Sequence, residues 1–168
     1  MKKSFTLIEL IFVIVIIGLL ASTAIPKFMQ TKASASSASA KSVVSSLRTA
    51  IETKHGEWII DDTLDSSDGY SSKGYPDKLD EASANTAGED LFVGTSKMKI
   101  LKNPIKSCLD NDCWFKYKAD DTNNKVYYYA YRFTEDDNIT LEYNASTGEF
   151  KCNNDGSMGK DACESIID

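Results

Sequence analysis

The chain has 168 residues and a formal net charge of −6, from 19 Lys and Arg against 25 Asp and Glu. This acidic balance disfavours a broad face for binding the phosphates of nucleic acids. The sequence has one histidine, no nucleophile motif and no phosphate-binding glycine loop, so we expect the protein not to be an enzyme.

The first segment is apolar from Phe5 to Ile25, and Glu9 is the one charged residue in it. As a helix this run would rise about 32 Å, enough to cross a hydrocarbon core of about 30 Å. Lys2 and Lys3 predict that the amino end lies in the cytoplasm and that the rest of the chain is exported. A carboxylate in hydrocarbon costs a few kcal/mol and usually marks function, so Glu9 needs a partner.

One alternative is a secretory signal peptide, which would be cut at the small residues Ser22-Thr23-Ala24, just before Ile25. The apolar run is long for such a peptide. A segment that is discarded also gains nothing from the charge of Glu9.

The hexapeptide Phe5-Thr6-Leu7-Ile8-Glu9-Leu10 resembles the processing and methylation motif of the type IV pilin superfamily, which includes type IV pilus subunits and the pseudopilins of type II secretion. Gly18 and Pro26 stand where such pilins commonly carry a glycine and a helix-kinking proline, so the resemblance covers about Lys2 to Phe28.

The resemblance implies that a prepilin peptidase cuts between Ser4 and Phe5 and methylates the new amine of Phe5. The family most often has glycine before the cut, so Ser4 predicts processing at reduced efficiency. The resemblance also implies that Glu9 meets the amine of Phe5 of a neighbouring subunit during assembly. Pairing two charges in a low-dielectric setting offsets part of their desolvation cost and favours correct register.

The partners implied are other subunits in a homo-oligomeric or hetero-oligomeric filament, the peptidase and an inner-membrane assembly platform. The implied location is the bacterial inner membrane, by a single pass, and then an extracellular pilus or a periplasmic pseudopilus. The filament would serve adhesion, motility, uptake or protein secretion. A membrane-tethered or secreted periplasmic binding domain or enzyme stays open as the alternative.

Helical character continues after Pro26. Apolar residues recur at three- and four-residue intervals from Val43 to Ile51, which predicts one buried helix face. Lys54-His55-Gly56 is a conventional stop signal, with His55 expected to be solvated or capping. Gly18 and Pro26 weaken the helix, and the resemblance implies that it extends there in filaments.

The interval from Trp58 to Ile100 has mostly turn and loop chemistry, with a short apolar element of undecided type at residues 91–93. The resemblance implies that this interval is variable and surface-exposed. Strands are predicted at residues 114–118, 125–133, 139–143 and 148–152, as an antiparallel meander. Tyr127, Tyr129, Tyr131 and Phe133 share one face, and one face of the sheet should pack on the helix stripe.

The expected fold is therefore α+β, with a long N-terminal helix packed on a C-terminal antiparallel sheet domain, as in pilins. We expect a leader at residues 1–4 and a helix at 5–55, of which 5–25 is transmembrane and later filament core. A globular domain with a disulfide-stapled C-terminal region is expected at 56–168.

Four cysteines, Cys108, Cys113, Cys152 and Cys163, lie in the last third of the chain, and an even count in an exported domain favours disulfides. Local pairing is the simplest of the three arrangements, but sequence does not exclude a crossed one. Zinc is disfavoured because no CxxC spacing occurs.

No cofactor is expected, although the acidic segments 110–112 and 153–161 could supply oxygen ligands to calcium. Asn138 and Asn144 lie in sequences that resemble the bacterial N-glycosylation sequon, and both could equally be hairpin polar residues. A local lysine cluster, formed by Lys97, Lys99, Lys102 and Lys106, could be a solvated loop edge or a small nucleic-acid contact.

Overall fold

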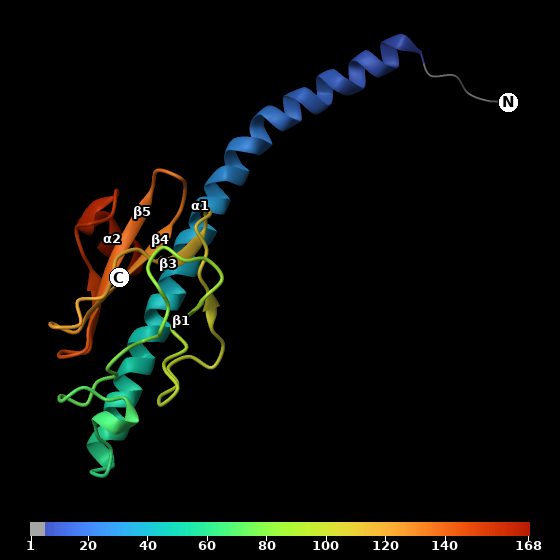
Figure 1. Ribbon diagram of the computed structural model, residues 1–168. Helices are drawn as coiled ribbons and strands as arrows, with labels where there is room; N and C mark the ends of the chain where they lie inside the picture. Colours follow the sequence, from blue (N-terminus) through green and yellow to red (C-terminus); the bar gives the residue numbers. More distant parts are fainter. Residues whose placement is uncertain (1–5) are drawn as a thin grey trace. The chain divides into compact units, whose positions relative to one another are not determined.

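The structure is a computed structural model that describes residues 6–168 (Figure 1). Its elements in chain order are α1 (Leu7–Ile60), the short 3-10 helix η1 (Ser66–Asp68), β1 (Asp90–Leu91), β2 (Ile105–Lys106), β3 (Cys113–Lys116), β4 (Val126–Arg132), β5 (Asn138–Asn144), β6 (Glu149–Cys152) and α2 (Gly159–Ile167). The chain divides into two compact units, Met1–Ser36 and Ser37–Asp168. The fold class is α+β, as predicted.

The first unit is helical over its described length from Leu7. Pro26 lies inside this helix and lacks the backbone N–H that would bond to the carbonyl four residues earlier. Two hydroxyl groups shortly before it bond to the backbone, since Ser22 Oγ donates to the Leu19 carbonyl at 2.8 Å and Thr23 Oγ1 donates to the Leu20 carbonyl at 3.0 Å. The helix continues through the proline to Ile60.

The second unit contains the last part of α1, two sheets and α2. The larger sheet is antiparallel with strand order β3-β4-β5-β6, and β1 pairs with β2 in a separate two-stranded sheet. Each strand of the meander lies within two residues of its predicted ends. The short apolar element at 91–93 is in part a strand, because Leu91 belongs to β1.

The core of this unit lies between the sheet and the apolar stripe of α1. Tyr127, Tyr129 and Tyr131 are at most 2% exposed, which confirms the predicted tyrosine face. They share one cluster with the buried helix residues Ala40, Val44, Leu47 and Ile51. The predicted packing of the sheet on the helix stripe is therefore confirmed.

The interval between the helix and the sheet contributes more to this core than its loop-like sequence suggests. Leu79, Leu91 and Phe92 are fully buried in it, and Tyr70 and Met98 are nearly so. The expectation that this interval is a surface loop is thus wrong for these side chains.

The predicted stop of the helix at residue 55 is also wrong, because α1 continues to Ile60. The His55 ring stacks on Tyr75 with ring centroids 3.9 Å apart, so His55 is a packing residue, not a capping one. The Trp58 ring lies against Gly74 so closely that a Cβ there would come within 2.3 Å of it. These contacts offset the cost of about 1 kcal/mol of a glycine, Gly56, inside a helix.

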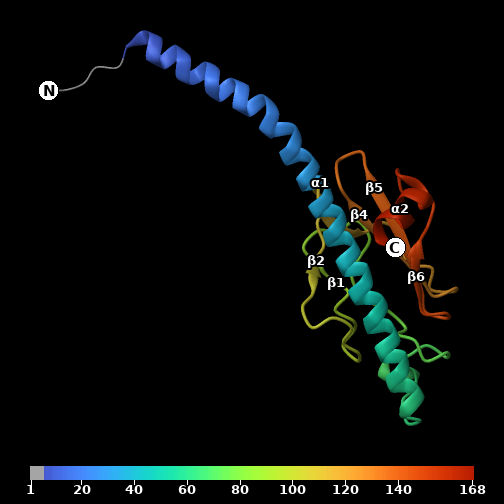
Figure 2. The same cartoon turned by 180° about the vertical axis from the view of Figure 1, so that it is seen from behind.

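The helix α2 was not predicted, and it packs on β5 and β6 (Figure 2). The disulfide between Cys152 and Cys163 joins it to the end of β6. Arg48 adds a second link, because it donates to the Phe150 carbonyl at 3.1 Å and pairs with Asp168 at 2.8 Å. The other disulfide joins Cys108 to Cys113, so both pairings are the local ones.

Candidate functional site

The first turn of α1 holds the carboxylate that the sequence singles out. The backbone N–H and the hydroxyl of Thr6 donate to Glu9 Oε2 at 3.1 and 2.9 Å, and the Glu9 N–H donates to Thr6 Oγ1 at 3.4 Å. This reciprocal arrangement is a capping box, which satisfies orphan donors at a helix start. The Thr-x-x-Glu spacing of residues 6–9 is its sequence signature, which sequence analysis passed over.

Both Thr6 bonds use the same oxygen of Glu9. Among residues 6–168, Glu9 Oε1 accepts no hydrogen bond. The cap therefore holds the carboxylate in one orientation with one oxygen open to a further donor. Ser4 and Phe5, the predicted cleavage and methylation residues, lie outside the described residues.

The helix after this turn has an exposed apolar surface over residues 7–29. The helix α1 is long and apolar enough to cross a membrane, because an 18-residue window of it has a mean hydropathy of 2.7. None of that window is buried in the structure. Leu7, Phe12 and Phe28 are 63–77% exposed. Gly18 has no atom within 4 Å of the place where its Cβ would be, so it is also open.

Both predicted glycosylation residues lie at the ends of β5. Asn144 Oδ1 accepts from the Ser146 N–H at 2.8 Å and so shapes the turn that follows β5. Asn138 Oδ1 accepts from the Ser157 N–H at 3.3 Å, and Thr140 of its sequon is buried and bonds to Asn153. Asn144 has the hairpin geometry that was the alternative to modification.

The start of the second segment considered for calcium, at residues 153–155, is engaged in other contacts. Asp155 accepts a hydrogen bond from the Tyr117 hydroxyl at 2.8 Å and lies 3.6 Å from Lys118 Nζ. Asn153 donates to the same tyrosine hydroxyl at 2.9 Å. Within residues 6–168 no group of three or more His, Cys, Asp or Glu side chains is arranged to hold a metal ion.

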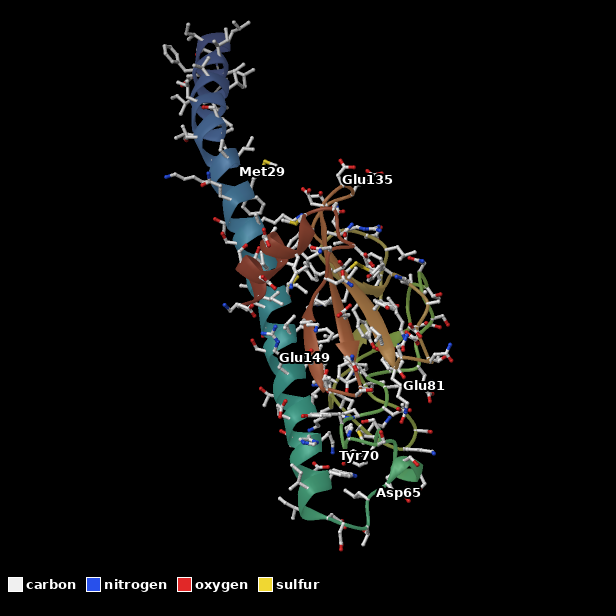
Figure 3. The ribbon with its side chains drawn as sticks, turned by 90° about the vertical axis from the view of Figure 1, so that its left-hand side faces the viewer. Met29, Asp65, Tyr70, Glu81, Glu135 and Glu149 are labelled. Carbon is white, nitrogen blue, oxygen red and sulfur yellow. A yellow bond between two sulfur atoms is a disulfide. The ribbon has the colours of Figure 1, made fainter. Side chains whose placement is uncertain are left out.

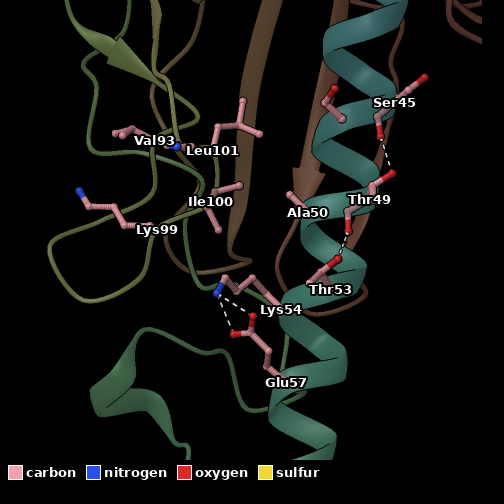
Figure 4. Close-up of a pocket in the computed structure, with 12 residues that line it drawn as sticks. Ser45, Thr49, Ala50, Thr53, Lys54, Glu57, Val93, Lys99, Ile100 and Leu101 are labelled. Atoms are coloured by element: carbon pink, nitrogen blue, oxygen red, sulfur yellow. Dashed lines mark hydrogen bonds and ion pairs between the residues drawn. The ribbon is translucent and has the colours of Figure 1, made fainter.

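The lysine cluster lies beside a groove of about 970 Å³ in the second unit (Figure 4). One wall is the α1 segment from Ser45 to Glu57, and the other is formed by residues 93 and 99–102. The helix wall carries small side chains, and the opposite wall supplies Val93, Ile100 and Leu101. Sequence analysis found the lysines but not the groove, because the groove depends on a contact between distant segments.

The cluster members have different partners. Lys106 pairs with Asp90 at 2.6 Å. Hydrogen bonds from Ser67 lower the pKa of the Asp65 carboxyl, and the charge of Lys97 adds a smaller contribution in the same direction. Lys99 and Lys102 line the groove and form no ion pair among residues 6–168.

The family model of the prokaryotic N-terminal methylation motif matches residues 1–25, which include Thr6, Glu9 and Gly18. No solved structure matches the chain. The chain thus combines the N-terminal methylation motif, a long apolar N-terminal helix and an antiparallel sheet domain. This combination is consistent with the type IV pilin superfamily.

Proposed function

We propose that the mature protein is a structural subunit of a type IV pilus-like filament. It would be processed between Ser4 and Phe5, methylated on Phe5 and assembled from the inner membrane. The observation that carries the proposal is the exposed apolar surface of α1 next to a single oriented carboxylate. Lipid can cover such a surface before assembly, and neighbouring helices can cover it afterwards.

The capping geometry supports a role for Glu9 in pairing with a neighbour. Thr6 occupies Oε2 and leaves Oε1 open among the described residues, so the amine of a neighbouring Phe5 could bind without breaking the cap. A charged pair in a low-dielectric setting is favourable only when both members are present. Glu9 would then control axial register in the filament.

Mass spectrometry of the mature protein tests the processing step. The expected product begins at Phe5, carries one methyl group on its amine and has lost four hydrogens to two disulfides. A mature chain that begins at Ile25 would instead support a secreted domain without an anchor.

Shearing of surface filaments tests the assembly step. Glu9→Gln keeps the size of the side chain and an oxygen for Thr6 but removes the charge, so we expect sheared filaments to be lost while the protein remains in the membrane. Thr6→Ser keeps the cap and is the matched control. Normal filament yield from Glu9→Gln would contradict the proposed pairing.

Imaging of the sheared fraction and of the cells themselves separates the two kinds of filament. Abundant surface fibres of this chain indicate a pilus, which serves adhesion, motility or uptake. Filaments confined to the periplasm, together with a secretion defect in a deletion strain, indicate a pseudopilus.

A further inference from the structure

The groove beside α1 has an apolar floor and an unpaired basic rim. Val93, Ile100 and Leu101 supply the apolar side opposite the small helix residues (Figure 4). Lys99 and Lys102 are exposed beside it, whereas Lys54 on the helix wall is already paired with Glu57 at 2.7 Å. The groove therefore offers two free cations next to a surface that gains from burial.

The complementary charge lies in the turn between β4 and β5. Glu135, Asp136 and Asp137 form the one run of three consecutive acidic residues in the sequence. All three are exposed, and none pairs with a cation among residues 6–168. Some other exposed carboxylates are already paired, such as Asp90 with Lys106 at 2.6 Å.

Hydrogen bonds inside this turn hold its shape. The Phe133 N–H donates to the Asp137 carbonyl at 2.9 Å, and the Asp137 N–H donates to Thr134 Oγ1 at 3.1 Å. A turn that is already ordered loses little entropy when it binds.

The turn and the groove occupy different ends of the second unit. Figure 3 shows Glu135 at one end and Tyr70 near the other. The Tyr70 hydroxyl lies 3.5 Å from Glu57, which lines the groove, so the groove reaches toward the Tyr70 end. Two complementary surfaces at different places on one molecule make a head-to-tail contact, which repeats into an open helical filament when it does not close into a ring.

We propose that the Thr134–Asp137 turn of one copy docks in this groove of a second copy, with its carboxylates against Lys99 and Lys102. The proposal rests on the proposed function, because it names the contact through which neighbouring globular units meet in the filament. The charged rim fixes which surfaces meet and in which register, and the apolar floor adds burial.

Charge reversal tests the contact. Glu135→Lys with Asp136→Lys places like charges together and should reduce the yield of sheared filaments roughly tenfold or more. A tenfold loss of affinity corresponds to about 1.4 kcal/mol of binding free energy. Lys99→Glu with Lys102→Glu should give the same loss. A chain that carries all four substitutions restores opposite charges and should recover most of the yield.

The exposed residues Lys73 and Glu149 provide matched controls, since Lys73→Glu and Glu149→Lys change charge at residues that belong neither to the turn nor to the lining of the groove. Both controls should assemble normally. Unchanged yield from both reversed pairs would overturn the docking proposal while leaving the filament itself established. Absence of wild-type filaments would instead contradict the proposed function.

Cysteine cross-linking gives a second readout that does not depend on yield. Described cysteines are all in disulfides, so Asp136→Cys and Lys99→Cys together introduce the two free thiols. Mild oxidation of sheared filaments should give a ladder of covalent multimers, which neither single variant gives. If the four-residue swap fails to recover yield and no ladder forms in filaments of the double-cysteine variant, the proposal is wrong.

Discussion

Lys116 Nζ lies 3.4 Å from Asp80 Oδ1, and these side chains are 2% and 0% exposed. The same nitrogen lies 2.9 Å from Asp120 Oδ2 and donates to the Ala82 carbonyl at 3.1 Å. Asp80 also accepts from the Phe92 N–H at 3.1 Å, so this lysine connects β3 to the interval that precedes the sheet. Burial raises the pKa of the Asp80 carboxyl, and the charge of Lys116 opposes that change.

Replacing Lys116 by methionine should lower the free energy of unfolding by about 3–5 kcal/mol, because it leaves the buried charge of Asp80 without its partner. Lys116→Met combined with Asp80→Asn should cost less than Lys116→Met alone. Urea unfolding of the full chain in detergent, followed by the fluorescence of Trp114, measures both. The Asp80→Asn single variant completes the comparison, and a loss in the double variant equal to the sum of the two single losses would show that the pair is not coupled.

The buried tyrosines should make the second unit unfold at alkaline pH. Burial raises the pKa of Tyr127, Tyr129 and Tyr143 above the ordinary value of about 10. In the unfolded chain these hydroxyls lose their protons first, so above pH of about 10 the unfolded state binds fewer protons than the folded state. Stability is therefore retained below that pH and falls as the pH rises beyond it.

Absorbance titration of tyrosinate checks this expectation. The buried tyrosines should ionise in a cooperative step together with loss of the sheet signal in circular dichroism. Tyr128 lies on the other face of β4 and is partly exposed, so Tyr128→Phe is the control that should leave the step unchanged. A gradual titration of all tyrosines without unfolding would contradict the prediction.

Removal of the disulfide between Cys152 and Cys163 should destabilise the domain by about 2–4 kcal/mol, because it frees a loop in the unfolded chain and releases α2 from β6. The sequence separation is 11 for this pair and 5 for Cys108 and Cys113, so the second removal should cost less. Paired Cys→Ser variants, compared by thermal unfolding, measure the difference. Faster tryptic cleavage after Lys160, in α2, should accompany only the first removal.

Gly74→Ala should destabilise the end of α1 more than Gly88→Ala. Both glycines have positive φ, +80° and +86°, so both substitutions cause backbone strain. At Gly74 the new Cβ would also come within 2.3 Å of the Trp58 ring, whereas at Gly88 nothing lies within 4 Å. Urea midpoints of the two variants isolate the packing contribution, and equal midpoints would show that Trp58 moves without cost.

The parts of the fold that depend on local patterns could be predicted from the sequence. Alternation along residues 127–133 identified the buried face of β4, and the three- and four-residue spacing from Val43 to Ile51 identified the helix face. Both periodicities are properties of neighbouring residues, so they can be read without knowing the partner surface.

The predictions that failed concern features that depend on contacts between residues far apart in the sequence. Leu79 lies among turn and loop residues and Phe92 in an apolar element of undecided type, and only the tertiary structure shows that both complete the core. The helix passes Gly56 because Trp58 and His55 find partners at Gly74 and Tyr75. No local signal predicts such contacts, and the groove beside α1 was missed for the same reason.

The candidate site shows the same division. The spacing of Phe5, Glu9, Gly18 and Pro26 pointed to the N-terminal motif, which the family comparison matches over residues 1–25. The hydrogen bonds between Thr6 and Glu9 required coordinates, although their sequence signature was already present.

The exposed apolar surface of the first unit determines which interactions can favour one partner helix over another. Lipid tails are as apolar as the exposed hydrophobic side chains between Leu7 and Met29, so exchanging lipid for a neighbouring helix brings little gain from water release. The preference of this helix for one partner must then come from close packing and from the few polar groups it carries. Small changes of shape along it, such as Ile16→Leu, which keeps the number of apolar atoms, would alter partner choice with little change in how strongly the chain avoids water.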